Sequence, residues 1–187
     1  MRKTIALIGA LSFALPAFAA SWVVDPLTSR LTFEGDQAGE KFKGSFGKFT
    51  SAIHFDEAAP EKGTIAITVD MASVQIDGKD RMDSLPTEDW FSVKQFPTAH
   101  FQSTSIKSLG ADKTGITQYE AKGKLSIRSI AKEITLPFSL KTTGNSAIAR
   151  GNVTLNRSDY SVGIGQWKTE QWVKFPVAVS FELHATK

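Results

Sequence analysis

The sequence contains no cysteine among its 187 residues. This absence excludes disulfide bonds, thiol nucleophiles and a lipoprotein anchor attached to a cysteine. The fold must therefore be stabilised by its hydrophobic core. A chain of this length is long enough to bury a sizeable core in one domain.

Long hydrophobic runs are also scarce. The longest, Ile5–Leu15, is too short to span a bilayer, and no later stretch approaches the length required. It follows Arg2 and Lys3 and precedes the small-x-small sequence Ala17-Phe18-Ala19. These features predict a secretory signal peptide over residues 1–19, followed by one domain over residues 20–187. In a Gram-negative bacterium we expect the exported protein to reside in the periplasm.

The chain lacks a cluster of positive charge. Its formal net charge is +3, and two of the 22 Lys and Arg residues lie within the expected signal peptide. The remaining charges of both signs are interspersed along the chain. Nucleic-acid binding requires a basic patch or stripe, so we do not expect a nucleic-acid partner.

The sequence offers little that resembles catalytic or metal-binding chemistry. Its three histidines, His54, His100 and His184, show no HxH or HxxxH spacing, and a metal site would need several ligands to converge. No GxSxG motif is present. We therefore predict no catalytic residue, no metal site and no cofactor, and do not expect an enzyme.

What the sequence has in abundance is alternation of apolar and polar residues. In Thr64–Asp70, for example, Ile65, Ile67 and Val69 share one face and polar residues or alanine occupy the other. This period of two is typical of strands with one buried face. The pattern predicts roughly eight long strands, at Ser29–Glu34, Lys41–Thr50, Thr64–Asp70, Thr98–Ile106, Tyr119–Arg128, Lys132–Lys141, Ala147–Asn156 and Val173–His184.

Such strands predict an all-β protein with antiparallel pairing, as either a sandwich or a barrel. Strand length favours the barrel, because Val173–His184 would extend about 40 Å at ~3.3 Å per residue. Small residues such as Gly123, Ala149 and Gly151 fall in the inward phase. They could leave an apolar void opposite the phenylalanines, or they could simply fit the taper of a filled barrel. The Gly-rich stretch Lys41–Thr50 should be bent.

The segment Asp77–Pro97 interrupts the alternation. Charged residues crowd its start, and large apolar residues follow at irregular spacing. Pro86 can begin a helix but not lie inside one, which predicts one short helical turn before it and one after it. We interpret this segment as a short helical lid set between the strands of the barrel.

An ordered set of motifs extends over nearly the whole expected domain. In chain order, it comprises Trp22, Asp25, Ser29, Leu31 and Phe33; Gly44, Ser45 and Phe46; Arg81, Leu85, Trp90, Phe91, Phe96 and Pro97, with Phe101 and Ser103 after them; Gly123, Leu125, Ser126 and Ile127; and Asn156, Arg157, Asp159, Tyr160, Val162 and Gly163. This set resembles the YceI-like (polyisoprenoid-binding) family. The sequence departs from the family pattern at Arg128-Ser129-Ile130, where the family more often has Gly-Val/Ile-Thr.

The resemblance implies a lipocalin-like extended antiparallel β-barrel with a long apolar pore. It also implies an exported protein that holds an isoprenoid-type amphiphile, such as a polyprenyl chain or a quinone, for transport or storage, and a possible homodimer. Two alternatives remain open. One is a structural or stress-related β-domain with a filled core, and the other is an enzyme that acts on such a lipid.

The candidate site follows from the apolar phase of each strand and from the lid. We predict that the pore is lined by Phe33, Phe46, Ile67, Phe91, Phe101, Leu125, Phe138 and Phe175. Trp90 and Phe91 are the predicted gate, because they are large and lie on the irregular segment. Arg81, Arg157 and Asp159 are candidates either for a ligand headgroup or for a structural role, in which Arg157 and Asp159 would hold a tight turn through a salt bridge and backbone hydrogen bonds.

Overall fold

Eleven strands form a single antiparallel sheet in the computed structural model, which describes residues 20–187. The predicted signal peptide lies outside the described residues. The strands are β1 (Ser21–Val24), β2 (Arg30–Gln37), β3 (Glu40–Phe46), β4 (Phe49–His54), β5 (Thr64–Asp70), β6 (Val74–Ile76), β7 (Thr98–Ala111), β8 (Thr117–Ile127), β9 (Ile130–Thr143), β10 (Ser146–Asn156) and β11 (Pro176–Thr186). The helices are α1 (Lys79–Ser84) and the short 3₁₀ turns Pro60–Lys62, Met71–Ser73, Arg157–Tyr160 and Gly165–Trp167.

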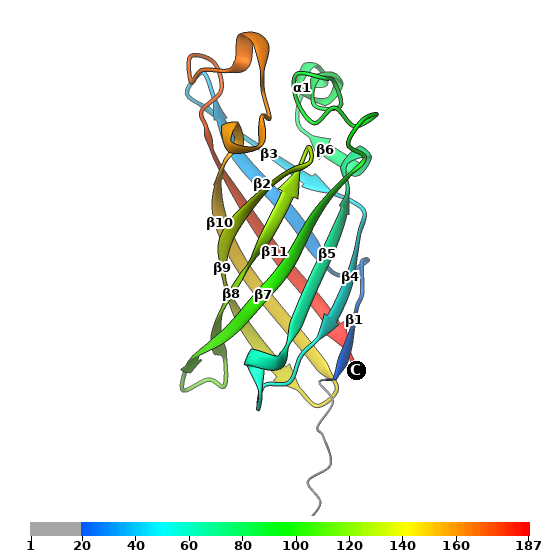
Figure 1. Ribbon diagram of the computed structural model, residues 1–187, viewed down its shortest axis with the longest axis vertical. Coiled ribbons are helices and arrows are strands. Elements are labelled where there is room, and N and C mark those ends of the chain that lie inside the picture. Colours follow the sequence, from blue (N-terminus) through cyan, green and yellow to red (C-terminus); the bar gives the residue numbers. More distant parts are fainter. Residues whose placement is uncertain (1–19) are drawn as a thin grey trace, which may run out of the picture.

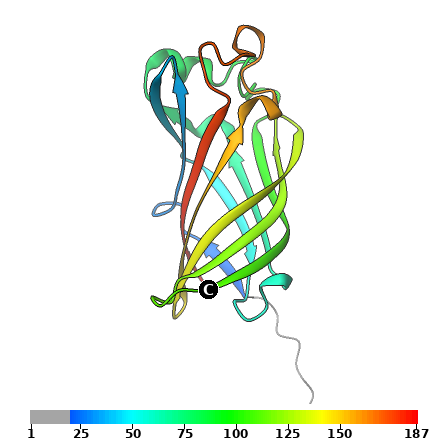
Figure 2. The ribbon, with the colours of Figure 1, turned by 90° about the vertical axis from the view of Figure 1, so that its left-hand side faces the viewer.

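Eight of these strands close into a barrel, which confirms the predicted fold class. The ring runs β1-β4-β5-β7-β8-β9-β10-β11, and it closes where Val23 and Val24 of β1 pair with Thr186 and Ala185 of β11. β11 pairs with β1 through its last residues and with β2 through residues 178–182, along the same edge. β3 and β6 extend the sheet beyond β2, in the upper half of the view (Figure 1). Turned by 90°, the barrel is again elongated, with α1 and the irregular loops gathered at one end (Figure 2).

The Gly-rich stretch is bent, as predicted. The predicted strand Lys41–Thr50 breaks at Gly47 and Lys48, and its two halves join different neighbours. β3 pairs with β2 and β6, whereas β4 pairs with β1 and β5. The bend therefore lets one segment contribute to both the upper and the lower wall of the barrel.

Of the two short helical turns predicted in the lid segment, residues 77–97, the first is a helix and the second is only a set of isolated turns. The helix before Pro86 is α1, but no helix forms after Pro86. The amide N–H groups of Phe91 and Ser92 donate to the carbonyl oxygens of Leu85 and Thr87, at 2.9 Å and 2.7 Å. These spacings of six and five residues do not propagate an α-helix, which needs repeated spacing of four. The spacing of four occurs once, from the N–H of Phe96 to the Ser92 carbonyl oxygen at 2.9 Å, and forms a single turn. The chain after Pro86 is instead a series of turns.

Glycines on the strands provide space for phenylalanine rings along the barrel wall. A Cβ atom added at Gly123 would lie 2.7 Å from Cζ of Phe101, and one added at Gly151 would lie 2.5 Å from Cζ of Phe181. Phe33 covers Gly44 on the paired strand in the same manner. Because the tip of each ring lies over a neighbouring glycine, the ring lies along the wall instead of extending toward the barrel axis. The interior of the barrel is thereby kept open.

This packing predicts that Gly151→Ala destabilises the protein by about 1–3 kcal/mol, the usual cost of overpacking. The added Cβ would also lie 2.5 Å from the carbonyl oxygen of Pro137, which is backbone and cannot rotate away. The control is Gly47→Ala, whose Cβ would meet only the Ser73 carbonyl oxygen at 3.6 Å. Urea unfolding measures both variants, and equal stabilities would contradict the packing argument.

A second prediction concerns the outer face, where Arg150 and His184 contact Glu182 at 2.7 Å and 2.8 Å. A hydrogen bond from Arg150, and to a smaller extent one from His184, lowers the pKa of Glu182 from 4.5 to about 2. A depressed carboxylate pKa stabilises the fold above the unfolded pKa, and this contribution is lost as pH falls. The difference in melting temperature between wild type and Glu182→Gln should therefore be largest at neutral pH and shrink toward pH 2. A difference that is independent of pH would contradict the assignment.

Candidate functional site: an apolar cavity closed by the lid

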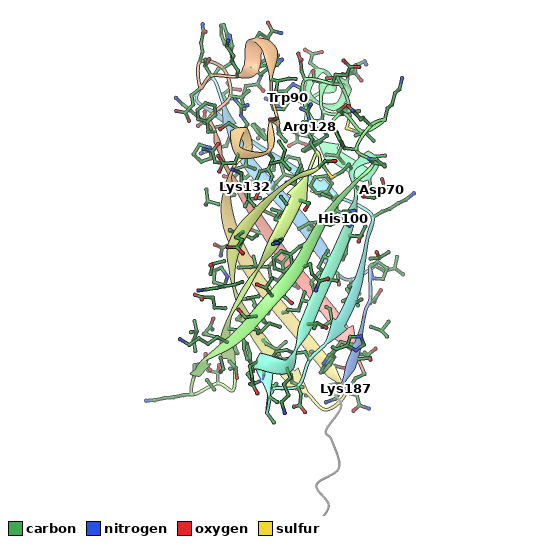
Figure 3. The ribbon with its side chains drawn as sticks, in the orientation of Figure 1. Asp70, Trp90, His100, Arg128, Lys132 and Lys187 are labelled. Atoms are coloured by element: carbon green, nitrogen blue, oxygen red, sulfur yellow. The ribbon has the colours of Figure 1, made fainter. Side chains whose placement is uncertain are left out.

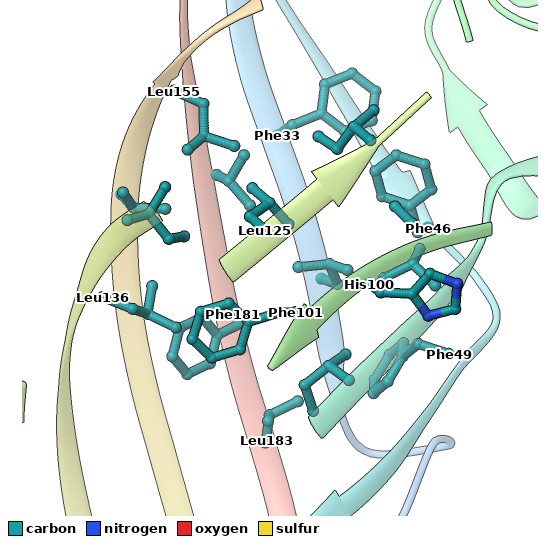
Figure 4. A pocket seen from close by; sticks show the side chains of 18 of the residues that line it. Phe33, Phe46, Phe49, His100, Phe101, Leu125, Leu136, Leu155, Phe181 and Leu183 are labelled. Carbon is teal, nitrogen blue, oxygen red and sulfur yellow. The ribbon is translucent and has the colours of Figure 1, made fainter. Parts of the chain in front are cut away.

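The barrel encloses a cavity of about 290 Å³ that is lined by residues from every wall of the barrel and from the lid. This volume is near the lower end of the ~300–1,000 Å³ typical of small-molecule sites. The lining includes Trp22 and Phe55 in one hydrophobic cluster and Leu85, Trp90 and Val173 in a second cluster at the lid end. Figure 4 shows the middle of the cavity, where side chains of several strands converge.

Seven of the eight predicted pore residues line this cavity. They are Phe33, Phe46, Ile67, Phe91, Phe101, Leu125 and Phe138. That they contact a ligand remains a prediction. Further lining residues, Leu136, Leu155, Phe181 and Leu183, belong to the same alternating phase of their strands, and that phase is the signal by which the sequence could have identified them.

Phe175 is not among the lining residues. It immediately precedes β11, and its ring centroid lies 5.2 Å from the guanidinium carbon of Arg157. The apolar alternation of the sequence begins at Val173, whereas β11 begins at Pro176, so Phe175 belongs to the preceding loop. Phe175 therefore packs against a buried cation instead of lining the cavity.

The cavity lining is almost entirely hydrocarbon. Among its residues, only His100, Arg157, Tyr160 and the two tryptophans carry a nitrogen or oxygen atom in the side chain. The ring nitrogens of His100 lie 3.1 Å from Oγ1 of Thr68 and 2.8 Å from Oγ1 of Thr98, so neighbouring threonines satisfy them. Nε1 of Trp22, in the cluster away from the lid, donates to the carbonyl oxygen of Phe55 at 3.0 Å. The cavity therefore favours an apolar occupant, and its remaining polar side chains, Trp90, Arg157 and Tyr160, lie at the lid end.

Arg157 is the charged residue of the lining, and its role is structural. It is only 4% exposed, and burial lowers its pKa. The guanidinium carbon lies 5.5 Å from the ring centroid of Trp90 and 5.2 Å from that of Phe175. Its N–H groups donate to the carbonyl oxygens of Val162, Gly163, Trp167, Thr169, Val173 and Lys174. Since an arginine has five N–H donors, none is left for a ligand.

The predicted salt bridge between Arg157 and Asp159 is wrong. Asp159 is exposed on the outside of the 3₁₀ turn, and no ion pair of Arg157 occurs within residues 20–187. Backbone carbonyl groups solvate the buried cation instead. Arg157 thereby organises residues 161–175, which we call the cap loop.

Arg81 also lies outside the cavity lining. Its Nε donates to Oε1 of Gln37 at 2.7 Å, and its Nη1 donates to the Asp77 carbonyl oxygen at 2.8 Å. The guanidinium carbon lies 5.7 Å from the ring centroid of Phe42. These contacts attach α1 to the β2–β3 hairpin, which is a structural role.

The predicted gate residues lie where the lid meets the cap loop. Trp90 and Phe91 both line the cavity, with Phe91 6.0 Å from Phe46 and Trp90 5.5 Å from Trp167 between ring centroids. Nε1 of Trp90 is buried and has no hydrogen-bond partner within the described residues. That the two residues act as a gate remains a prediction.

Lid, cap loop and barrel wall are joined by backbone carbonyl groups and one arginine. The Asp89 carbonyl oxygen accepts hydrogen bonds from the N–H groups of Gly163 and Ile164, both at 2.8 Å. Arg128, in the β8–β9 turn, donates through Nη1 to the carbonyl oxygens of Trp90, at 2.6 Å, and Ser161. Figure 3 shows Arg128 and Trp90 at the same end of the barrel. In the sequence, Arg128 marks only a departure from the family pattern, and no local pattern indicates this contact.

We expect Arg157→Lys to destabilise the protein by about 3 kcal/mol or more, because several buried carbonyl groups lose their donors. Lysine keeps the charge but has only three donors, so it cannot replace the guanidinium. Asp159→Asn is the matched control and should shift stability by less than about 0.5 kcal/mol, as exposed substitutions do. Denaturant unfolding monitors both variants. A strong effect of Asp159→Asn would restore the salt-bridge interpretation.

Two further features bear on the kind of site. Within residues 20–187, no group of three or more His, Cys, Asp or Glu side chains is arranged to hold a metal ion. The helices of this part of the chain are all too short or too polar to cross a membrane.

Comparison with known proteins agrees with this geometry. A YceI-like domain matches residues 22–185. A UPF0312 protein of Azotobacter vinelandii is 31% identical over 149 residues, which cover 73% of this chain and 71% of that protein. The crystal structure of Burkholderia cenocepacia BcnA is 31% identical and superposes with a TM-score of 0.81, over 87% of this chain and 99% of BcnA.

A polyisoprenoid-binding domain from Saccharophagus degradans, implicated in plant cell wall breakdown, shares the fold. Its TM-score is 0.68 at 13% identity, over 88% of this chain and 97% of that domain. The match of sequence and fold extends over nearly all the described residues. The chain belongs to the YceI-like family.

Proposed function

We propose that this protein is an exported lipid-binding protein that holds an isoprenoid-type amphiphile, a polyprenyl chain or a quinone, for transport or storage. The site of action would be the periplasm, after removal of residues 1–19. The protein would need no cofactor, and it could act as a homodimer.

The observation that carries this proposal is the apolar cavity inside the barrel. Each CH₂ group moved from water into such a space contributes roughly 0.8 kcal/mol. A long hydrocarbon tail therefore gains binding energy without any directional contact. A structural domain with a filled core, the first alternative, would have no need of phenylalanine rings that lie over glycines of neighbouring strands and leave the interior hollow.

The polar groups at the lid end favour an uncharged headgroup over a phosphate. All N–H donors of Arg157 are occupied by carbonyl groups, so this cation cannot also bind an anion. A buried donor without a partner is costly, and Nε1 of Trp90 has no partner among residues 20–187. A carbonyl or hydroxyl oxygen of a quinone or prenol could accept its hydrogen bond after a small adjustment of the lid.

The family relationship supports the same proposal. The YceI-like fold is a binding-domain fold, and the Saccharophagus degradans domain of this fold is described as polyisoprenoid-binding. An enzyme acting on such a lipid is the second alternative. It would require catalytic residues beside the cavity, whose lining is hydrocarbon apart from the few side chains described above.

The first test is mass spectrometry of an organic extract of the protein purified from its native host. We expect an isoprenoid amphiphile in near-stoichiometric amount. An extract without any lipid, or with only the phospholipids of the surrounding membrane, would contradict the proposal. Incubating the protein with the extracted lipid and looking for a converted product tests the enzyme alternative.

The second test changes the cavity volume. Ala149 lines the cavity on β10, and Ala149→Leu adds three carbon atoms to its interior. The control is Ala178→Leu on the exposed face of β11. We expect Ala149→Leu to weaken binding of the uncharged fluorescent probe N-phenyl-1-naphthylamine about tenfold, equivalent to ~1.4 kcal/mol. The control should bind as wild type, and equal affinities of all three folded proteins would contradict binding in the barrel.

A further inference from the structure

The β8–β9 turn has a sequence poorly suited to its conformation. It consists of two residues, Arg128 and Ser129, between the paired residues Ile127 and Ile130. Their φ angles are 51° and 62°, so both adopt the left-handed conformation. Two-residue turns of this kind strongly prefer Asn-Gly, because side chains with a Cβ are disfavoured at positive φ. Strained positions of this kind often coincide with functional sites.

The side chain of Arg128 offers a reason for its presence there. Its Nη1 donates to the carbonyl oxygens of Trp90 in the lid and Ser161 in the cap loop, and its guanidinium carbon lies 5.8 Å from the ring centroid of Phe96. One side chain thus joins the barrel wall to both segments that close the cavity. Hydrogen bonds from a charged donor are stronger than those between neutral groups.

The two ends of this contact differ in rigidity. β8 and β9 pair over their whole facing length, from Thr117↔Leu140 to Ile127↔Ile130, so the turn is a fixed point on the wall. The lid beyond α1 and the cap loop consist mostly of turns. Apart from Arg128, the hydrogen bonds that join them directly are those from Gly163 and Ile164 to the Asp89 carbonyl oxygen, within the described residues. Segments with few such bonds open more easily than the strands.

We propose that Arg128 is a latch that holds the lid and the cap loop together over the cavity, and that it sets the rate at which the ligand enters and leaves. The inference rests on the proposed function. Trp90 of the lid and Val162 of the cap loop are both buried and both line the lid end of the cavity. A ligand that enters at this end passes between these two segments, so their separation widens the entrance. Release of the guanidinium contacts is the step that permits this separation.

The test compares two variants of the same turn. Ser129→Gly relieves strain at one position and keeps the latch. The double variant Arg128→Asn with Ser129→Gly creates the preferred Asn-Gly turn and removes the latch. A residue needed only for the fold would lower stability when it is removed. A latch predicts instead that the double variant unfolds at the same or higher urea concentration than wild type and still exchanges ligand faster.

Release of N-phenyl-1-naphthylamine into phosphatidylcholine vesicles, followed by stopped-flow fluorescence, measures the exchange rate. We expect Ser129→Gly to match wild type within about twofold and the double variant to release the probe about tenfold faster, as expected for loss of a charged hydrogen bond. Equal release rates in all three proteins would overturn the latch. Accelerated release together with a lower urea midpoint would also overturn it, because Arg128 would then support the fold.

Amide hydrogen exchange separates this proposal from the proposed function. The latch predicts faster exchange at the N–H groups of Gly163 and Ile164 in the double variant, with unchanged exchange in β8 and β9. This readout needs no ligand. Failure of wild type to bind the probe would contradict the proposed function alone, whereas unchanged exchange at Gly163 and Ile164 would contradict the latch alone.

Discussion

Closure of the sheet is the constraint on which the rest of the structure depends. Because the ring of strands is complete, alternate side chains can face only the interior, and the period-two pattern becomes an inside and an outside. The inside must then be filled by side chains or left hollow. Phenylalanine rings lie over Gly44, Gly123 and Gly151 of paired strands. The rings leave space at the centre of the barrel, and they cover the backbone of the glycines. The apolar wall and the cavity thus come from the same residues.

At the end of such a barrel, irregular loops contain backbone carbonyl groups that strand pairing does not satisfy. In this protein a buried arginine donates hydrogen bonds to them. Arg157 gathers carbonyl oxygens of the cap loop around one guanidinium, with two aromatic rings close to it. The carbonyl groups of the loop gain hydrogen-bond donors, and the buried cation needs no carboxylate partner. The N–H groups of Arg157 are then no longer free to bind an anionic ligand.

The alternation in the sequence predicted strands with one apolar face, and strand length together with the family resemblance favoured a barrel over a sandwich. Seven of the eight pore residues predicted from the sequence line the cavity, since residues such as Phe33, Phe101 and Phe138 follow the strand phase. Two predictions from the sequence were wrong. Phe175 continues the alternation of the last strand in the sequence but precedes the first residue of β11. Asp159 is close to Arg157 in the sequence, but its side chain faces solvent. The role of Arg128 depends on contacts between segments more than 30 residues apart, about which local patterns carry no information.

The pairing of β1 with β11 has a consequence for how the molecule assembles. Val23 and Thr186 are neighbours in the finished wall although almost the entire domain separates them along the chain. Contacts of such long range bear a large loop-closure entropy and slow the folding reaction. The pairing of β1 with β11 can form only once the whole polypeptide has been synthesised. Until then the uncapped edges of the growing sheet are open to pairing with other chains, which makes the unfinished barrel a natural client for chaperones.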